Sequence, residues 1–254
     1  MHRRAATSLM LLASALVPVQ VFGQGAPTLE LSNFSGVWQE TIHEDSYERS
    51  GGPPLGDYQG IPLSAAGRMK ADSHDHSDWS IPEFQCRPHS APYQWRALGS
   101  VRFWDEIDPI GRDLTAIHVE YLRSADRVIW MDGRPHPPEW APHTWMGFAT
   151  GKWDGNILTI HTTHIKQGWH RRNGLPSSDK IDLIDHFILH DNLLTHVSVV
   201  TDPVYLSEPL VKSEDFVKNT NPNGNWLWPC EYVNELPGSD RTRVPSFLPG
   251  SNPF

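Results

Sequence analysis

The chain has 14 histidines, and nine of them lie between residues 118 and 196. Imidazole changes its charge near neutral pH, so a histidine can move protons, and its neutral form suits Zn, Cu, Fe or Ni. Several of these histidines stand in runs typical of β-strands, where adjacent strands can bring them together with carboxylates. The sequence therefore predicts a histidine-lined site, which holds a divalent metal or works as a metal-free acid–base site.

Asp185 and His196 lie in two runs separated by the turn-forming dipeptide Asp191-Asn192. If this dipeptide is a two-residue hairpin loop, His196 lies opposite Phe187 and Asp185 lies opposite Ser198, all on one face. That face is the more apolar one, so we expect it to form the barrel interior. An unpartnered polar group there costs about 1–3 kcal/mol, so Asp185 and His196 must satisfy one another, a ligand or a metal. In the metal-free alternative, Asp185 orients His196 for proton transfer.

Other strands are expected to extend this site. We predict that His118 and His161 join His196 and Asp185 as catalytic residues, and the same three histidines are the candidate metal ligands. The candidate binding residues are Glu120, which shares a strand face with His118; the aromatic residues Trp104 and Trp130; His143 in a proline-rich loop at the barrel mouth; and Arg171, whose guanidinium can hold a substrate carboxylate.

Segments rich in β-branched and aromatic residues must position these side chains. We expect strands at 100–107, 114–122, 127–131, 156–165, 180–189 and 193–201, preceded by a turn and an aromatic strand near residues 33–40. This spacing favours a mostly β chain with a single antiparallel barrel, and a β-sandwich is the alternative. A Pro/Gly-rich N-terminal excursion precedes the barrel, and Ser64 is expected to cap one short helix over residues 65–71.

The N-terminus has the layout of a secretory signal peptide. Arg3 and Arg4 precede an apolar run from Leu9 to Val21, and small residues follow it. The run is too short for a spanning helix of ~20 residues, and no later stretch reaches that length without charge or proline. We therefore expect an exported protein, periplasmic or secreted, with no transmembrane segment. The expected organisation is a signal peptide at 1–23, a linker at 24–31, a barrel domain at 32–235 and an irregular tail at 236–254.

Charge and cysteine content limit the partners and the redox chemistry. The formal net charge is −9, and removal of residues 1–23 with their two arginines makes it −11. An acidic chain without a basic run lacks the electrostatic features of a nucleic-acid binding protein. The two cysteines, Cys86 and Cys230, would meet an oxidising compartment after export. We predict that they form a disulfide.

The motif Gly36-Val37-Trp38 resembles the Gly-x-Trp signature on the first strand of lipocalin-like (calycin) barrels, in which the tryptophan plugs the closed end. Residues from about 128 to 203 resemble a widespread, largely uncharacterised family of exported bacterial proteins. This similarity includes Met131-Asp132-Gly133-Arg134-Pro135-His136-Pro137, Thr144-Trp145-Met146-Gly147, Gly151-Lys152-Trp153-Asp154-Gly155 and Thr201-Asp202-Pro203. The resemblance implies a lipocalin-like barrel. The chain departs from the family pattern at His161, at Asp185-His186 and at His196, where the family usually has an acidic residue, Glu-Arg and an aliphatic residue.

We therefore expect an exported enzyme that acts on a small apolar or aromatic molecule in a barrel pocket lined by histidines and carboxylates. Lyase, isomerase and hydrolase chemistry are all compatible with proton transfer by histidine, with or without a divalent metal. The alternative is a periplasmic binding protein that carries a hydrophobic small molecule or a metal without catalysis, and a purely structural role is the third possibility.

Overall fold

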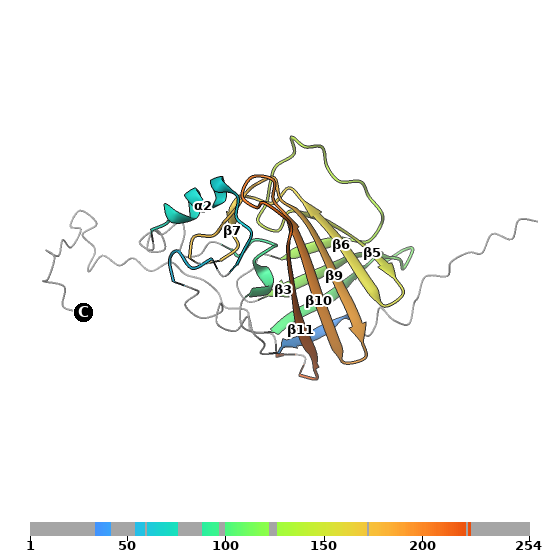
Figure 1. Ribbon diagram of the computed structural model, residues 1–254. Coiled ribbons are helices and arrows are strands. Elements are labelled where there is room, and N and C mark those ends of the chain that lie inside the picture. Colours follow the sequence, from blue (N-terminus) through green and yellow to red (C-terminus); the bar gives the residue numbers. More distant parts are fainter. Residues whose placement is uncertain are drawn as a thin grey trace, which may run out of the picture.

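The computed structural model describes residues 34–41, 54–58, 60–75, 88–96, 100–121, 126–171, 173–221 and 223–224, which form a closed β-barrel (Figure 1). Nine strands close it in the order β1, β11, β10, β9, β6, β5, β4, β3, β2. Their bounds are Gly36–Glu40 for β1, Ser100–Ile107 for β2, Leu114–Tyr121 for β3, Arg127–Trp130 for β4, Phe148–Asp154 for β5, Ile157–Thr163 for β6, Asp182–His190 for β9, Leu193–Thr201 for β10 and Leu210–Asn219 for β11. The expected mostly β barrel with a short helix is confirmed, and the sandwich alternative is wrong.

The hairpin of β9 and β10 has the expected register. His196 pairs with Phe187, and Ser198 pairs with Asp185. The turn begins at Asp191, whose φ of 53° lies in the left-handed region that aspartate tolerates better than most residues. Since side chains alternate along a strand, this register turns Asp185 and His196 to the same inner face. Both side chains are fully buried.

Trp38 on β1 is fully buried in the barrel core, as the sequence predicts. Its indole Nε1 donates a hydrogen bond to the carbonyl oxygen of Phe34 at 2.8 Å. Lys218 of β11 places its ammonium 4.7 Å from the indole ring centroid and donates to the carbonyl oxygen of Ser35 at 2.6 Å. The first and last barrel strands are therefore tied together around one tryptophan.

The described residues between β1 and β2 pack over one end of the barrel, where they share a second apolar cluster with barrel residues. Helix α2, Ala65–Asp72, is capped by Ser64, whose hydroxyl accepts a hydrogen bond from the Gly67 amide at 3.0 Å. A small sheet of β7, Gly168–Trp169, and β8, Pro176–Ser177, lies beside this helix (Figure 1). The apolar side chains of this cluster include Tyr58, Ile61, Ala91, Ile165, Leu175, Leu183, Val200 and Leu206.

Strands β4 and β5 pair in parallel, and a long irregular loop, residues 131–147, connects them. Polar contacts tie this loop to the end of β6. The Thr144 amide donates to the carbonyl oxygen of His164 at 3.0 Å, and His143 Nδ1 lies 3.0 Å from the carbonyl oxygen of Ile165. The proline-rich part of the chain is therefore a loop that is anchored beside the barrel wall.

Strands β5 and β11 are absent from the sequence-based expectation, whereas β2 and β10 have the expected bounds. The signal peptide, the linker, the C-terminal tail and both cysteines, Cys86 and Cys230, lie outside the described residues. No helix within the described ranges is long and apolar enough to cross a lipid bilayer.

Candidate functional sites

A chain of four ionisable side chains crosses the barrel interior. Arg127 of β4 donates to Asp185 of β9 at 2.7 Å. The other oxygen of Asp185 lies 2.8 Å from Nε2 of His196 on β10. Nδ1 of His196 lies 2.9 Å from Glu214 on β11. Four strands thus contribute one residue each to a continuous polar path through an apolar core.

The two carboxylates determine the protonation state of His196. Burial acts to lower its pKa, but hydrogen bonds and charge from Asp185 and Glu214 outweigh burial and raise the pKa above its usual value. Burial acts in the opposite direction on Asp185, and the charges of Arg127 and His196 overcome it and lower the pKa of that carboxyl. Both ring nitrogens face acceptors, so the protonated imidazolium satisfies the network, and two positive charges balance two negative ones.

This geometry bears directly on the catalytic role predicted for His196 and Asp185. An imidazolium whose two N–H groups bind carboxylates has no lone pair with which to accept a proton. His196 is only 1% exposed, and Phe187 stacks on its ring at a centroid distance of 4.5 Å. The arrangement therefore suits an internal ion network, and the catalytic assignment of these two residues stays a prediction.

His118 and Glu120 lie on the outer face of β3, away from His196. The ring of His118 stacks on Trp104 with 3.7 Å between centroids, and its two nitrogens lie 2.8 Å from Glu106 and 3.1 Å from Asp126. Burial acts to lower the pKa of His118, but these two carboxylates raise it. Glu120 forms an ion pair with Arg102 at 3.6 Å.

The other predicted residues are also distributed over separate parts of the barrel. The guanidinium of Arg134 lies over the ring of Trp130, 3.5 Å from the ring centroid. His161 lies on the outer face of β6, where Nε2 is 2.7 Å from Asp182. The expectation that His118, His161 and His196 share one metal site therefore does not hold. Among the described residues, no three His, Cys, Asp or Glu side chains are placed to hold a metal ion.

A cleft of about 320 Å³ opens between loop 131–147, the end of β6 and residues 179–182 at the start of β9, and we call it the rim cleft. It gathers three of the histidines and several polar side chains around one space. Its lining residues are His136, Pro137, Glu139, His143, Thr163, His164, Asp179, Lys180, Ile181 and Asp182. His161 lies next to the lining, with its ring centroid 4.5 Å from that of His136. The rim cleft thus brings His143 and His161, which the sequence predicts to be functional, close to residues that the sequence does not predict.

Hydrogen bonds connect the rim-cleft residues in series. Thr163 Oγ1 lies 2.8 Å from Nδ1 of His164 and 2.8 Å from Nδ1 of His136. His164 Nε2 lies 3.0 Å from the carbonyl oxygen of Pro138, and His136 Nε2 lies 2.9 Å from Oγ1 of Thr150. The Thr163 hydroxyl is therefore held between two imidazoles.

The end of this series fixes the direction of every hydrogen bond in it. The carbonyl of Pro138 can only accept, so Nε2 of His164 carries the hydrogen. In a neutral ring, Nδ1 of His164 is then the acceptor, and the Thr163 hydroxyl donates to it. Thr163 in turn accepts from Nδ1 of His136, whose Nε2 accepts from the Thr150 hydroxyl. His164 is thus placed as a base for the proton of Thr163, with a backbone carbonyl that orients the ring.

The backbone conformation of His164 and the pKa of His136 also favour a functional role for the rim cleft. His164 has a φ of 57°, a left-handed conformation that is uncommon outside glycine, although histidine adopts it more readily than most residues. Such strain is found at functional sites, where the surrounding structure maintains it. Burial, with the nearby His161 and His164, lowers the pKa of His136, so this ring is neutral at pH 7 and can donate through Nδ1.

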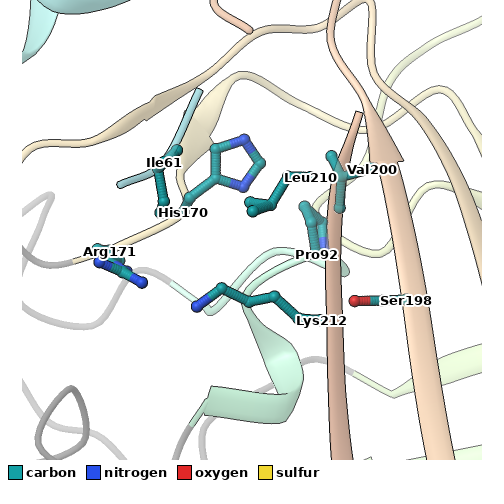
Figure 2. A pocket seen from close by; sticks show the side chains of 8 residues that line it. All are labelled: Ile61, Pro92, His170, Arg171, Ser198, Val200, Leu210 and Lys212. Carbon is teal, nitrogen blue, oxygen red and sulfur yellow. The ribbon is translucent and has the colours of Figure 1, made fainter. Parts of the chain in front are cut away.

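Arg171 lies in a different place, at the covered end of the barrel. It is 4% exposed and lines a small pocket with His170, Ser198 and Lys212 (Figure 2). This pocket is formed by β10, β11 and the segments that pack over them.

Comparison of the chain with protein-family models, with curated proteins and with solved structures gave no match to any of them.

Proposed function

We propose that this protein is an exported hydrolase that cleaves small esters in the rim cleft, with Thr163 as nucleophile and His164 as general base. One observation carries the proposal: the Thr163 hydroxyl lies 2.8 Å from Nδ1 of His164, whose Nε2 lies 3.0 Å from the Pro138 carbonyl, at the wall of an open cleft. A nucleophile, a base and a group that orients the base are the three parts that such a site needs.

In the first step, Thr163 Oγ1 attacks the carbonyl carbon of the ester while its proton moves to Nδ1 of His164. The ester C–O bond then breaks, and the imidazolium of His164 returns the proton to the departing alcohol. Water attacks the carbonyl carbon of the resulting acyl-threonine while His164 takes the proton of that water. The bond between this carbon and Oγ1 then breaks, His164 returns the proton to Oγ1, and the free acid leaves. Histidine-based proton transfer of this kind contributes about 10²–10⁴-fold to rate.

Other rim-cleft residues support binding and charge stabilisation. Nδ1 of His136 donates toward Thr163, so it lies close to the carbonyl oxygen that becomes negative during attack. Lys180 also lines the cleft, where it pairs with Glu139 at 3.5 Å. Pro137 and Ile181 supply apolar wall. A small acyl group fits this combination, and His143 and His161 act as binding residues in the proposal.

Export and the family relationship belong to the same proposal. The support for export is the Arg-apolar-small pattern of residues 1–23, and a periplasmic or secreted location follows from it. The closed barrel agrees with the lipocalin-like fold implied by Gly36-Val37-Trp38. Membership of the exported bacterial family stays a proposal based on the quoted motifs.

The test is hydrolysis of a short-chain aryl ester by the wild-type protein and by three variants. Thr163→Val keeps the shape of the side chain and removes the hydroxyl, whereas Thr163→Ser keeps the hydroxyl. His164→Asn removes the base and tolerates the positive φ. We expect kcat/KM to fall at least ~100-fold for Thr163→Val and His164→Asn and by less than ~10-fold for Thr163→Ser.

Thermal melts of the same preparations provide the control. If Thr163→Val hydrolyses the ester as fast as wild type, the proposal is wrong, whatever the melting temperature. If Thr163→Val and Thr163→Ser lose activity only in proportion to unfolded protein, the hydrogen-bond series anchors loop 131–147 and does no chemistry.

A further inference from the structure

The outer surface of one barrel wall is unusually apolar. Strands β6, β9, β10 and β11 lie side by side in this wall (Figure 1). Their outward side chains form a surface that we call the wall face: Ile157, Thr159, Ile184, His186, Ile188, His190, Leu193, Thr195, Val197, Val199, Val211, Ser213, Asp215 and Val217. Eight of these fourteen residues are aliphatic, whereas the solvated face of an antiparallel sheet is usually polar. We propose that the wall face binds the wall face of a second copy of this chain.

The aliphatic side chains of the wall face are contiguous. The strand register sets them side by side in three groups: Val211 with Val199 and Ile184, Ile188 with Ile157, and Leu193 with Val217. Val211 is 58% exposed, and Val217 and Leu193 are each more than a third exposed. The folded chain therefore leaves these side chains in contact with water, and contiguous apolar surface of this kind marks interaction sites.

The charge of the wall face favours a second copy over other partners. The chain has a formal net charge of −9, yet Asp215 is the one carboxylate among the fourteen wall-face residues, and none of them is Lys or Arg. Depletion of charge is typical of the core of a protein interface. A membrane-binding face would carry Lys or Arg with Trp or Tyr, and the wall face has none of these.

A two-fold axis parallel to β10 gives the polar side chains of the wall face partners. Strands β9 and β11 flank β10, so this operation lays β11 of one copy over β9 of the other. Val211 then faces Ile184, because both lie level with the same residue of β10. Asp215 lies between the levels of His186 and His190, so the carboxylate of each copy meets imidazole N–H groups of the other.

The size of the wall face also fits a dimer. The longest strands have nine or ten residues, so at about 3.4 Å per residue and about 4.8 Å between strands the face measures about 30 Å by about 20 Å. This projection of about 600 Å² reaches the lower end of the area that each partner buries in a stable interface. Two sheets pack face to face in this way at about 10 Å when their strands are nearly aligned.

Sedimentation equilibrium of the purified protein between about 1 and about 100 µM tests the proposal. We expect a concentration-dependent mass that approaches twice that of the chain. Ser213→Arg puts a charge in the middle of the wall face, and Asp215→Lys turns an ammonium toward the imidazoles; each should raise the dimer Kd at least ~10-fold. Both positions are exposed, so the monomer should fold, which circular dichroism checks. Ile110→Lys is the control, because this 92% exposed residue lies between β2 and β3, outside the wall face.

A wild-type protein that stays monomeric at about 100 µM overturns the proposal, whether another protein or another segment of the chain then covers the wall face. A dimer whose Kd is the same in wild type, Ser213→Arg and Asp215→Lys also overturns it, because that dimer would use a different surface. An equal rise of the Kd in Ile110→Lys would show that added positive charge alone weakens association, and it would remove the support for the wall face.

Discussion

Removal of the His196 side chain by His196→Leu should destabilise the barrel strongly. Asp185 keeps its ion pair with Arg127 at 2.7 Å, but Glu214 loses the imidazole to which one of its oxygens is bound, and its other oxygen has no hydrogen-bond partner. The side chain of Glu214 is 4% exposed, so its charge stays inside the core. Breaking a buried pair by removal of one partner costs about 3–5 kcal/mol, and we expect a loss of this size in the free energy of unfolding.

The double variant His196→Leu/Glu214→Leu isolates the cause. It removes both members of the broken pair and leaves Arg127 with Asp185, and apolar replacement of a whole buried pair is often neutral or stabilising. Urea denaturation followed by far-UV circular dichroism at pH 7 gives the free energies. We expect the double variant to recover most of the loss. The account of the network is refuted if His196→Leu costs under ~1 kcal/mol or if the double variant is no more stable than the single one.

Three further predictions concern pH, packing and the cysteines. The pKa of His196 is raised in the folded protein, so the stability that His196 contributes is complete below its unfolded pKa of about 6.5 and is lost as the pH rises through its folded pKa. The pKa of Asp185 is lowered, so the stability that Asp185 contributes is lost as the pH falls below about 3.9. The difference in unfolding free energy between wild type and His196→Leu should therefore shrink as the pH rises above about 6.5, and a difference that stays flat would contradict it. Trp38→Ala should cost about 3–5 kcal/mol by urea denaturation, because Trp38 is fully buried; a cost near zero would place the residue outside the core. Thiol titration of unfolded, unreduced protein should find no free thiol if Cys86 and Cys230 are bonded, and two thiols per chain would disprove the bond.

The sequence predicts the parts of the fold whose periodicity is regular. The β9–β10 hairpin follows from Asp191-Asn192 and the alternation on either side of it, and its register is the one expected. Strand β5 was missed because Gly151 weakens the strand pattern. The structure explains this glycine: a Cβ at that position would lie 2.6 Å from the sulfur of Met131 and 2.8 Å from Ile129.

Strand β11 and the ion network were missed for a related reason. The inward positions of β11 include Lys212 and Glu214, so its inner face lacks the apolar repeat by which a half-buried strand is recognised. Glu214 lies opposite His196 on β11, the next strand along the chain, and was missed with that strand. Arg127 reaches Asp185 from β4, which is not a neighbour of β9 in the sheet. Local patterns predict that Asp185 and His196 face inward together, but they contain no information about which distant strands complete the network.

The rim cleft depends on backbone geometry that no local pattern reveals. Strict alternation from His161 places His164 on the opposite side of the strand. Strand β6 ends at Thr163, and the positive φ of His164 brings its ring back to the Thr163 hydroxyl. The loop that carries His136 and Pro138 then completes the series from the other side of the cleft. The proline-rich composition predicts a loop, but only the structure shows which residues this loop contacts.

The central claim is that Thr163 is a nucleophile activated by His164, and covalent trapping tests it most directly. An alkyl fluorophosphonate reacts with an activated hydroxyl to form an O–P bond with loss of fluoride, and intact mass spectrometry with peptide mapping locates the label. We expect one label, on Thr163, that is absent from Thr163→Val and forms much more slowly in His164→Asn. An unlabelled wild-type protein, or a label that Thr163→Val carries equally, would contradict the account.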